Sequence, residues 1–412
     1  MKLGVYYKSR LTGEIEQTES GDMQFRYDRD WVNAEDGFSL SYSLPRREEV
    51  FTTEANFFFS NYLPEGPVRV AICRKHGISV DNDFALLRQI GGECAGALVI
   101  SESYPEASKN RYEELQLDRI AELITRHEVY AALTGKQDMR LSLAGAQDKL
   151  PILLDGETLK LPLGDAASTH ILKFSNVDYS DLVHNEYYTM KLAKNLGVPT
   201  PEVALFPVQD DNFLIVTRYD RLVGDESVDR LHQEDICQAL SINPKKKYEK
   251  EGGPSFDQVY ALITEASDSP LTDNKLVLQW QIANVFLGNC DGHPKNLSLL
   301  RTNDGQWRLA PFYDLVCTMV YPGLTKDLAM NIGGVGEIGN LISVHWKRFA
   351  KTLNVGWKVV ESIYEQSFEI FPKALEKTHE ELVAECGDLK TFRKLKELLG
   401  KNHHRLGKQW AR

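Results

Sequence analysis

Short runs of alternating apolar and polar residues dominate the N-terminal third of the chain. Residues 3–7 predict a strand, and 14–19 and 24–27 are strand candidates joined by a turn signal at Ser20-Gly21-Asp22. Apolar residues recur at helical spacing in 83–90 and 111–127, which predicts two helices there. The pattern favours a β-rich N-terminal module without evident catalytic chemistry.

The pattern then changes twice. After position 138, the apolar runs 150–154 and 169–174 predict strands, and Asp181 is placed to cap a helix that follows them. After position 222 the spacing is mostly helical, with Asp273 as the predicted cap of one helix and a hairpin over 297–309. The chain is therefore expected to divide into three stretches, which are 1–138, 139–222 and 223–412.

Composition narrows the class of protein. The chain has 59 acidic and 48 basic residues, and a net charge of −11 disfavours a free-standing DNA-binding protein. The six cysteines are widely spaced without a Cys-x-x-Cys pair, which predicts reduced thiols. No segment approaches the ~18 apolar residues of a membrane span, and no export signal is evident. We expect a cytoplasmic protein that does not contact a membrane.

Asp291 and Asn296 have the most informative spacing in the chain. The Asp-x-x-x-x-Asn spacing, between an apolar helix and a hairpin, is that of the protein-kinase catalytic loop. Phosphoryl transfer needs a carboxylate that orients and deprotonates the attacking hydroxyl, and an oxygen ligand for Mg²⁺. Asp314, just past the hairpin, has the position of a second metal ligand. The alternatives are turn-forming roles for the first two residues and a helix cap for Asp314.

Two features of the middle stretch suit a nucleotide. Lys173 stands alone among the apolar residues of a predicted strand, where it either faces solvent on a sheet edge or meets an anion. Glu186, in the next helix, could hold Lys173 as in a kinase small lobe, or could serve the helix dipole. The small residues between Ser142 and Lys149 could offer backbone N–H groups to phosphate, although an ordinary hairpin loop would look similar.

Taken together, these motifs resemble the HipA family of bacterial serine/threonine kinase toxins. The matching segments are 62–66, 90–97, 142–149, 169–173, 233–238, 248–255 and 288–296. The resemblance implies an α+β, two-lobed, protein-kinase-like fold with an extra β-rich N-terminal module and an all-helical C-terminal lobe. In these terms 1–138 is the N-terminal HipA module, 139–222 the nucleotide-binding small lobe and 223–412 the catalytic lobe.

The resemblance also implies an activity and its residues. Family members transfer phosphate from Mg²⁺-bound ATP to protein serine or threonine, with Asp291 as the base and Asn296 and Asp314 as metal ligands. Ser142 stands where members autophosphorylate, and a phosphate there would inactivate the kinase by adding charge beside the phosphate loop. The residues expected at the nucleotide are Ala144, Gly145, Ala146, Gln147, Asp148, Lys149, Lys173, Thr217, Arg218, Tyr219, His293, Pro294, Lys295, Asn296, Tyr313 and Asp314.

Partners follow from the same resemblance. Family members pair with a DNA-binding antitoxin, HipB, and co-repress their own operon, and their known substrates include glutamyl-tRNA synthetase. Residues 390–412 hold eight Lys or Arg against one Glu. This segment is either a solvated helix face or a patch that touches operator phosphates through Lys390, Arg393 and Lys394. Two other functions stay open, a small-molecule kinase of the same fold and a non-catalytic ATP-binding co-repressor.

Overall fold

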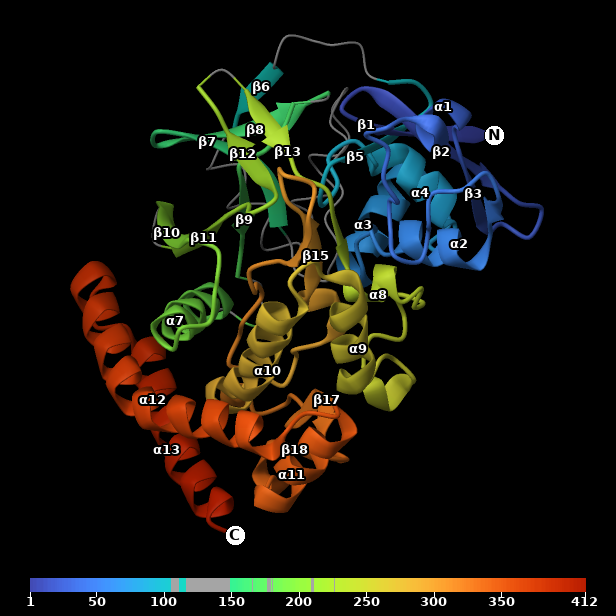
Figure 1. Ribbon diagram of the computed structural model, residues 1–412. Coiled ribbons are helices and arrows are strands. Elements are labelled where there is room, and N and C mark those ends of the chain that lie inside the picture. Colours follow the sequence, from blue (N-terminus) through green and yellow to red (C-terminus); the bar gives the residue numbers. More distant parts are fainter. Residues whose placement is uncertain are drawn as a thin grey trace. The chain divides into compact units, whose positions relative to one another are not determined.

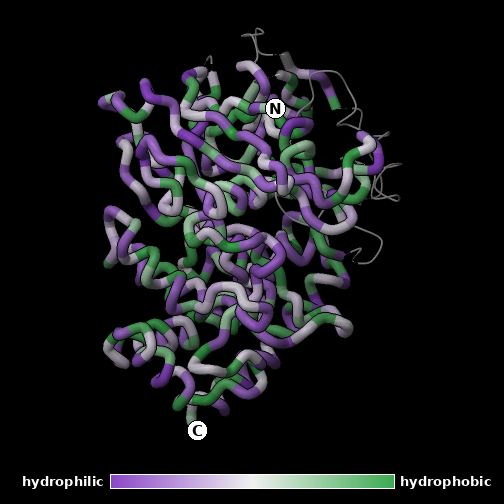
Figure 2. Tube along the Cα trace, turned by 90° about the vertical axis from the view of Figure 1, so that its right-hand side faces the viewer, coloured by the Kyte–Doolittle hydropathy of each residue, from purple (hydrophilic) through white to green (hydrophobic). Residues whose placement is uncertain are grey.

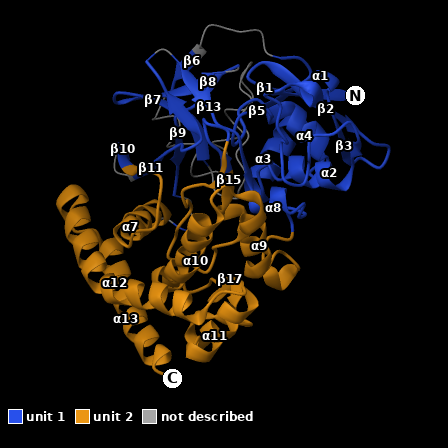
Figure 3. Cartoon of the chain, in the orientation of Figure 1, with its two compact units in different colours: residues 1–180, 205–245, 300–305 blue, residues 181–204, 246–299, 306–412 orange. Residues whose placement is uncertain are grey.

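The structure is a computed structural model in which the chain forms two compact units (Figure 3). Unit 1 comprises Met1–Ser180, Leu205–Lys245 and Leu300–Gly305, and unit 2 comprises Asp181–Ala204, Lys246–Leu299 and Gln306–Arg412. Each unit is therefore assembled from separated parts of the sequence. The residues that the structure describes are 1–104, 111–115, 149–164, 166–175, 179, 181–208, 211–225 and 227–412.

Unit 1 begins with a five-stranded sheet whose strand order is β4-β3-β2-β1-β5, all neighbours being antiparallel. Figure 1 labels four of its strands, β1, β2, β3 and β5. Its elements are β1 (Lys2–Tyr7), β2 (Arg10–Gln17), β3 (Met23–Tyr27), α1 (Arg29–Asn33), β4 (Val50–Phe51), α2 (Thr53–Ser60), α3 (Gly66–His76), α4 (Asp83–Ile90) and β5 (Leu98–Ser101). The strands predicted near 3–7, 14–19 and 24–27 are confirmed as β1, β2 and β3, and the helix predicted over 83–90 is confirmed as α4. Phe25, Phe58 and Phe59 are fully buried and form part of the core between sheet and helices.

A second sheet, which belongs to unit 1 except for the first two residues of β10, has the order β10-β11-β9-β7-β8-β6. Its strands are β6 (Arg111–Glu114), β7 (Lys149–Asp155), β8 (Thr158–Leu163), β9 (His170–Lys173), β10 (Val203–Val208) and β11 (Asp211–Thr217). The helix predicted from 111 onward is wrong at its start, because residues 111–114 pair with β8 through backbone hydrogen bonds. Two small strands, β12 (Arg221–Val223) and β13 (Val228–Arg230), form a hairpin, and β14 (Gln233–Asp235) leads into α8 (Ile236–Ala239).

Unit 2 is mostly helical, as expected for the C-terminal lobe. Its helices are α7 (Leu182–Asn195), α9 (Phe256–Ala266), α10 (Pro270–Leu287), α11 (Ser343–Thr352), α12 (Trp357–Cys386) and α13 (Lys390–Trp410), with short 3₁₀ turns η1 (Glu249–Glu251), η2 (Pro294–Asn296), η3 (Thr318–Val320) and η4 (Ile338–Asn340). The predicted hairpin is present as β15 (Ser298–Arg301) and β16 (Trp307–Leu309). A further hairpin, β17 (Asp327–Ile332) with β18 (Val335–Glu337), turns at Gly333 and Gly334, both of which have positive φ.

Asp273 does not cap α10 as predicted. The helix begins three residues earlier, at Pro270, and the carboxylate of Asp273 is buried in its first turn. There it accepts hydrogen bonds from the Arg308 guanidinium and, at 2.9 Å, from the Leu309 backbone N–H. The side chain therefore fixes β16 against α10, a tertiary role that a local capping pattern does not reveal.

Hydrophobic and hydrophilic residues interleave along the coloured part of the chain trace in Figure 2. None of the helices in the described ranges has both the length and the apolarity that a bilayer crossing requires. All six cysteines are described, and none of them lies in a disulfide.

Candidate active site

The loop that carries Asp291 is held by the end of α10 and by η3. Gly288 ends the helix in the left-handed conformation, and a Cβ at this position would meet Met319 Sδ at 3.0 Å. The Cys290 N–H donates to Thr318 Oγ1 at 2.9 Å, and the Met319 N–H donates to Gly288 O at 3.1 Å. The loop is thus fixed at its start before the chain reaches the carboxylate.

The structure brings Asp291 and Asn296 together. The backbone carbonyl of Asp291 accepts hydrogen bonds from the His293 N–H at 2.8 Å and from Asn296 Nδ2 at 3.2 Å. The Asp291 N–H donates to Asn289 Oδ1 at 3.1 Å. Pro294, Lys295 and Asn296 form η2, and all three are buried. The five-residue spacing therefore closes into one loop in which the Asn296 amide turns its nitrogen toward Asp291.

Tyr248 is a neighbour of this loop that the sequence analysis did not assign. Its hydroxyl donates to Asp291 Oδ1 at 2.6 Å, and its ring meets that of His293 edge to face at a centroid distance of 5.5 Å. The sole sequence signal was that Tyr248 opens one of the segments shared with the HipA family.

Asp314 follows the hairpin in a strained backbone conformation. Its φ is +55°, a left-handed value that few residues other than glycine, Asn and Asp adopt. The preceding Tyr313 accepts from Ser298 Oγ at 2.7 Å and donates to Lys295 O at 2.9 Å, so its hydroxyl ties the hairpin to the loop that carries Asp291. The helix-cap alternative for Asp314 is wrong, because the next helical turn begins at Thr318 and is capped by Cys317.

Asn296 and Asp314 have the oxygen-ligand chemistry that a magnesium ion takes, and their role as its ligands stays a prediction. Because Nδ2 of Asn296 is used within the loop, its Oδ1 is the atom left to coordinate a cation, and Asp314 supplies a carboxylate. Mg²⁺ prefers such oxygen ligands and commonly takes only one or two from the protein, completing its shell with phosphates and water. The described residues hold no cluster of three or more His, Cys, Asp or Glu arranged for a metal.

Lys173 lies in unit 1, on an interior strand. Strand β9 runs between β11 and β7, with Lys173 opposite Leu214 on one side and Lys149 on the other. Lys173 is 4% exposed, so the solvent-facing, edge-strand alternative is wrong. A buried ammonium group requires an anionic or hydrogen-bonding partner. Glu186 is also buried, on α7 of unit 2, and its pairing with Lys173 stays a prediction.

The segment Thr217–Tyr219, expected at the nucleotide, leads from the end of β11 into a buried ionic cluster. The Arg218 guanidinium donates to Glu93 Oε1 at 3.0 Å and to Asp220 Oδ1 at 2.9 Å. The Arg218 guanidinium is therefore engaged in hydrogen bonds to these two carboxylates, and we expect any contact of Arg218 with a nucleotide to involve its main chain. Tyr219 donates its hydroxyl to Gln233 Oε1 at 2.5 Å.

Glu93 is the centre of this cluster and accepts from the guanidinium groups of three arginines, which are Arg218, Arg221 and Arg230. Burial alone would raise the pKa of Glu93, but the three positive charges hold it well below its usual range. The cluster joins the loop after α4 to the end of β11 and the β12–β13 hairpin, and so fixes the segment 217–219 within unit 1.

The predicted phosphate loop is only partly described. Ser142, Ala144, Gly145, Ala146, Gln147 and Asp148 lie outside the described residues. Lys149 is the first residue of β7 and is half-buried opposite Lys173. The roles predicted for the loop stay predictions.

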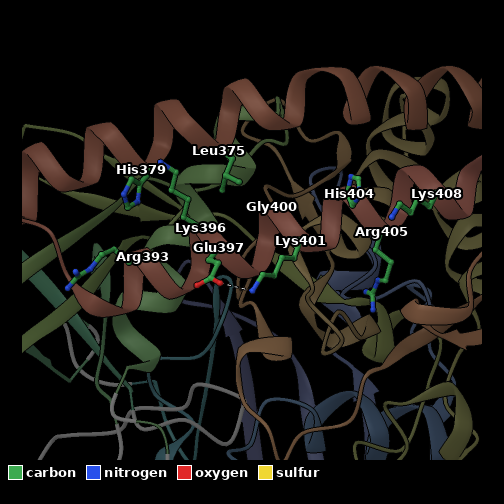
Figure 4. A pocket seen from close by; sticks show the side chains of 10 residues that line it. All are labelled: Leu375, His379, Arg393, Lys396, Glu397, Gly400, Lys401, His404, Arg405 and Lys408. Atoms are coloured by element: carbon green, nitrogen blue, oxygen red, sulfur yellow. Dashed lines mark hydrogen bonds and ion pairs between the residues drawn. The ribbon is translucent and has the colours of Figure 1, made fainter.

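The basic C-terminal segment forms one wall of a groove. A cavity of about 980 Å³ lies between α12 and α13 (Figure 4), and its lining residues are Leu375, His379, Arg393, Lys396, Glu397, Gly400, Lys401, His404, Arg405 and Lys408. Part of the charge is paired, since Lys396 meets Glu376 at 2.8 Å and Lys401 meets Glu397 at 2.6 Å. Lys390 and Lys394 are exposed on the same helix. The opposite, apolar face of α13 packs inward through Phe392, Leu395 and Leu399.

Comparison with known proteins identifies the family. The HipA N-terminal domain family matches residues 3–101, and the HipA-like C-terminal domain family matches residues 141–375. The chain is 36% identical over 392 residues to the Y4mE protein of Sinorhizobium fredii, a candidate kinase, which covers 91% of this chain and 92% of that protein.

The serine/threonine-protein kinase toxin HipA of Shewanella oneidensis is 30% identical over 346 residues, covering 81% of this chain and 78% of the toxin. A solved complex of the Shewanella oneidensis HipA, HipB and operator DNA contains a chain that superposes with a TM-score of 0.85 at 26% identity, covering 98% of this chain and 97% of that one. Both domain families and the fold agree, and the chain belongs to the HipA family of kinases.

Proposed function

We propose that the chain is an ATP-dependent serine/threonine-protein kinase and the toxin of a toxin–antitoxin pair. The observation that carries this proposal is the closed loop in which Asn296 is hydrogen-bonded to Asp291, with Asp314 after the following hairpin. The similarity to a serine/threonine-protein kinase toxin over most of the chain supports the assignment of the acceptor as a protein hydroxyl.

Each residue then has a role in transfer. The acceptor hydroxyl attacks the γ-phosphorus of ATP, and Asp291 accepts the hydroxyl proton. Asn296 and Asp314 hold Mg²⁺, which when bound neutralises charge on the phosphates. Lys173 and Lys295 are buried ammonium groups suited to phosphate oxygens. Burial of the cations in a partly dry site strengthens these interactions relative to water.

We further propose that the kinase inactivates itself at Ser142. Incubation of purified wild-type protein with Mg²⁺ and ATP should add one phosphate to the intact mass, and peptide mapping should place it on Ser142. Ser142→Ala and Asp291→Ala should each remain unmodified. A wild type that starts unmodified, binds ATP and gains no phosphate would favour a small-molecule kinase or a non-catalytic co-repressor instead.

The antitoxin and DNA contacts are proposed from the solved relative, which was captured with HipB and operator DNA. In this chain, Arg393 lines the basic groove and Lys390 and Lys394 are exposed beside it, so these side chains can neutralise backbone phosphates. The double variant Arg393→Glu, Lys394→Glu should weaken operator binding by the complex at low salt and lessen its salt dependence, without loss of antitoxin binding. Unchanged operator affinity would indicate that the basic face of α13 is a solvated helix face that does not contact DNA.

The physiological acceptor is a separate question. The family resemblance suggests a translation component such as glutamyl-tRNA synthetase, and we propose it as the first acceptor to test. Phosphate on the synthetase with wild-type kinase, and none with Asp291→Ala, is the expected result.

A further inference from the structure

The hydroxyl of Tyr248 reaches the carboxylate that the proposed function assigns as the base. The donor–acceptor distance from Tyr248 Oη to Asp291 Oδ1 is 2.6 Å, although the two residues are 43 positions apart in sequence. The acceptor in this hydrogen bond is a carboxylate oxygen of Asp291. Both residues belong to unit 2.

The ring of Tyr248 is held from several sides. It packs edge to face against His293 at a centroid distance of 5.5 Å, and Lys247 Nζ lies 5.6 Å from its centroid. Its backbone carbonyl accepts from the N–H groups of Glu251 and Gly253, each at 2.9 Å. Gly253 is required for this turn, because a Cβ there would clash with the backbone carbonyl of Lys246. The segment therefore has little freedom to withdraw the phenol.

The next residue anchors the segment to the β17–β18 hairpin. Glu249 accepts from the backbone N–H of Asn331 at 2.6 Å and from its Nδ2 at 2.8 Å. Because Asn331 lies on β17, the chain of contacts runs from that strand through Glu249 to Tyr248 and on to Asp291. The position of Tyr248 is thus fixed by contacts with β17 as well as by the loop that carries Asp291.

Asp291 needs such a partner. Its main chain is fixed at both ends, by Asn289 on the N–H and by His293 and Asn296 on the carbonyl. The terminal torsion of an aspartate is broad, so these backbone contacts do not determine which carboxylate oxygen faces an incoming hydroxyl. A phenol donor on Oδ1 settles that choice and leaves Oδ2 for the acceptor.

We propose that Tyr248 is a positioning residue for phosphoryl transfer, a proposal that rests on the proposed function. Its hydroxyl holds Oδ1 of Asp291 so that Oδ2 takes the proton of the acceptor hydroxyl. In that step the acceptor oxygen forms a bond to the γ-phosphorus, the bond from this phosphorus to the β–γ bridging oxygen breaks, and ADP leaves with the electron pair. Tyr248 gives up no proton and contacts no reacting atom.

The test is Tyr248→Phe, which removes the hydroxyl and keeps the ring against His293. The matched control is Tyr260→Phe on α9 of the same unit, because the Tyr260 hydroxyl has no hydrogen-bond partner among the described residues. Self-phosphorylation is followed by intact mass over a range of ATP concentrations with Mg²⁺ in excess. This gives the rate at saturation and the half-saturating ATP concentration separately.

We expect Tyr248→Phe to lower the saturated rate about 10- to 100-fold, the order of loss that a misplaced catalytic group causes, and to leave the half-saturating ATP concentration within about twofold of wild type. Tyr260→Phe should match wild type in both. An unchanged rate in Tyr248→Phe would overturn the proposal, and so would a faster rate, which would mean that the phenol occupies the acceptor's place.

Two further outcomes distinguish a positioning role from a general disturbance of the site. A parallel loss of rate and ATP affinity in Tyr248→Phe would indicate a disturbed loop rather than a misplaced carboxylate, and would also overturn the proposal. If wild-type protein transfers no phosphate at all, the proposed function itself fails, and the positioning role falls with it. Thermal unfolding of both variants, expected within a few degrees of wild type, checks that the fold is kept.

Discussion

Replacement of Glu93 by Gln should destabilise unit 1 strongly. The carboxylate is 2% exposed and accepts from three arginine side chains as well as from the backbone and hydroxyl of Ser168, at 3.2 and 2.8 Å. In the wild type, three arginines face two carboxylates, those of Glu93 and Asp220, for a cluster charge of +1. Glu93→Gln leaves three arginines against Asp220 alone, and the buried charge rises to +2.

The expected cost follows from the burial of the cluster. Removing one partner of a buried ion pair typically costs about 3–5 kcal/mol, because the remaining charge is left uncompensated out of water. We expect a loss of that order in the free energy of unfolding of unit 1. The contrasting variant is Asp36→Asn, which removes a carboxylate paired with Arg10 at 2.6 Å on the surface of the same unit. Exposed ion pairs are screened by solvent, so Asp36→Asn should leave the free energy of unfolding of unit 1 nearly unchanged.

Hydrogen exchange monitored by mass spectrometry can measure the loss of stability in unit 1 separately from unit 2. Protected peptides of β5 and of β11 should exchange faster in Glu93→Gln by the factor that corresponds to the lost stability, while peptides of α10 should change less. Because the pKa of Glu93 is held below its usual range, the carboxylate remains charged and its contribution persists at neutral pH and is lost only in strong acid. A Glu93→Gln protein with wild-type exchange in unit 1 would refute the reasoning.

Two other predictions concern stability. Burial raises the pKa of Glu234 to about 8, although the hydrogen bond from Ser41 opposes this shift, so the folded state keeps a proton that the unfolded state releases above about pH 4.5. The free energy of unfolding of unit 1 should therefore fall as the pH rises from about 4.5 to about 8. Urea unfolding of Glu234→Gln should show a weaker dependence on pH over this range. Trp410 stacks on Tyr364 at a centroid distance of 3.7 Å at the end of α13, so Trp410→Ala should cost about 2 kcal/mol and raise exchange in α13, and wild-type protection there would contradict it.

The sequence predicted the parts of the site that are local in the chain. Asp291 and Asn296 were found because the four residues between them form a loop short enough to bring them together. Asp314 was singled out by its position just past the hairpin, and its role as a metal ligand stays a prediction. The apolar run around Lys173 predicted its strand. Pairing of that strand on both sides then excluded an edge position, and the burial of Lys173 excluded a solvent-facing side chain.

What the sequence did not reveal depends on contacts between distant segments. Tyr248 meets Asp291 across 43 residues, and Arg218 meets Glu93 across 125, distances over which no periodicity carries information. Asp273 has the local pattern of a cap, but its partner Arg308 lies 35 residues away and determines its role. The strand at 111–114 was missed because its pairing with β8, and not its own spacing, defines it.

The rate of phosphate transfer by Asp291→Asn tests the central claim most directly. Single-turnover transfer from ATP should fall at least about 100-fold in this variant, with ATP binding retained, because the base is lost and the nucleotide ligands are not. Asp257→Asn, at an exposed position on α9, is the matched control and should transfer at the wild-type rate. Wild-type transfer by Asp291→Asn would contradict the assignment of this loop as the site of phosphoryl transfer.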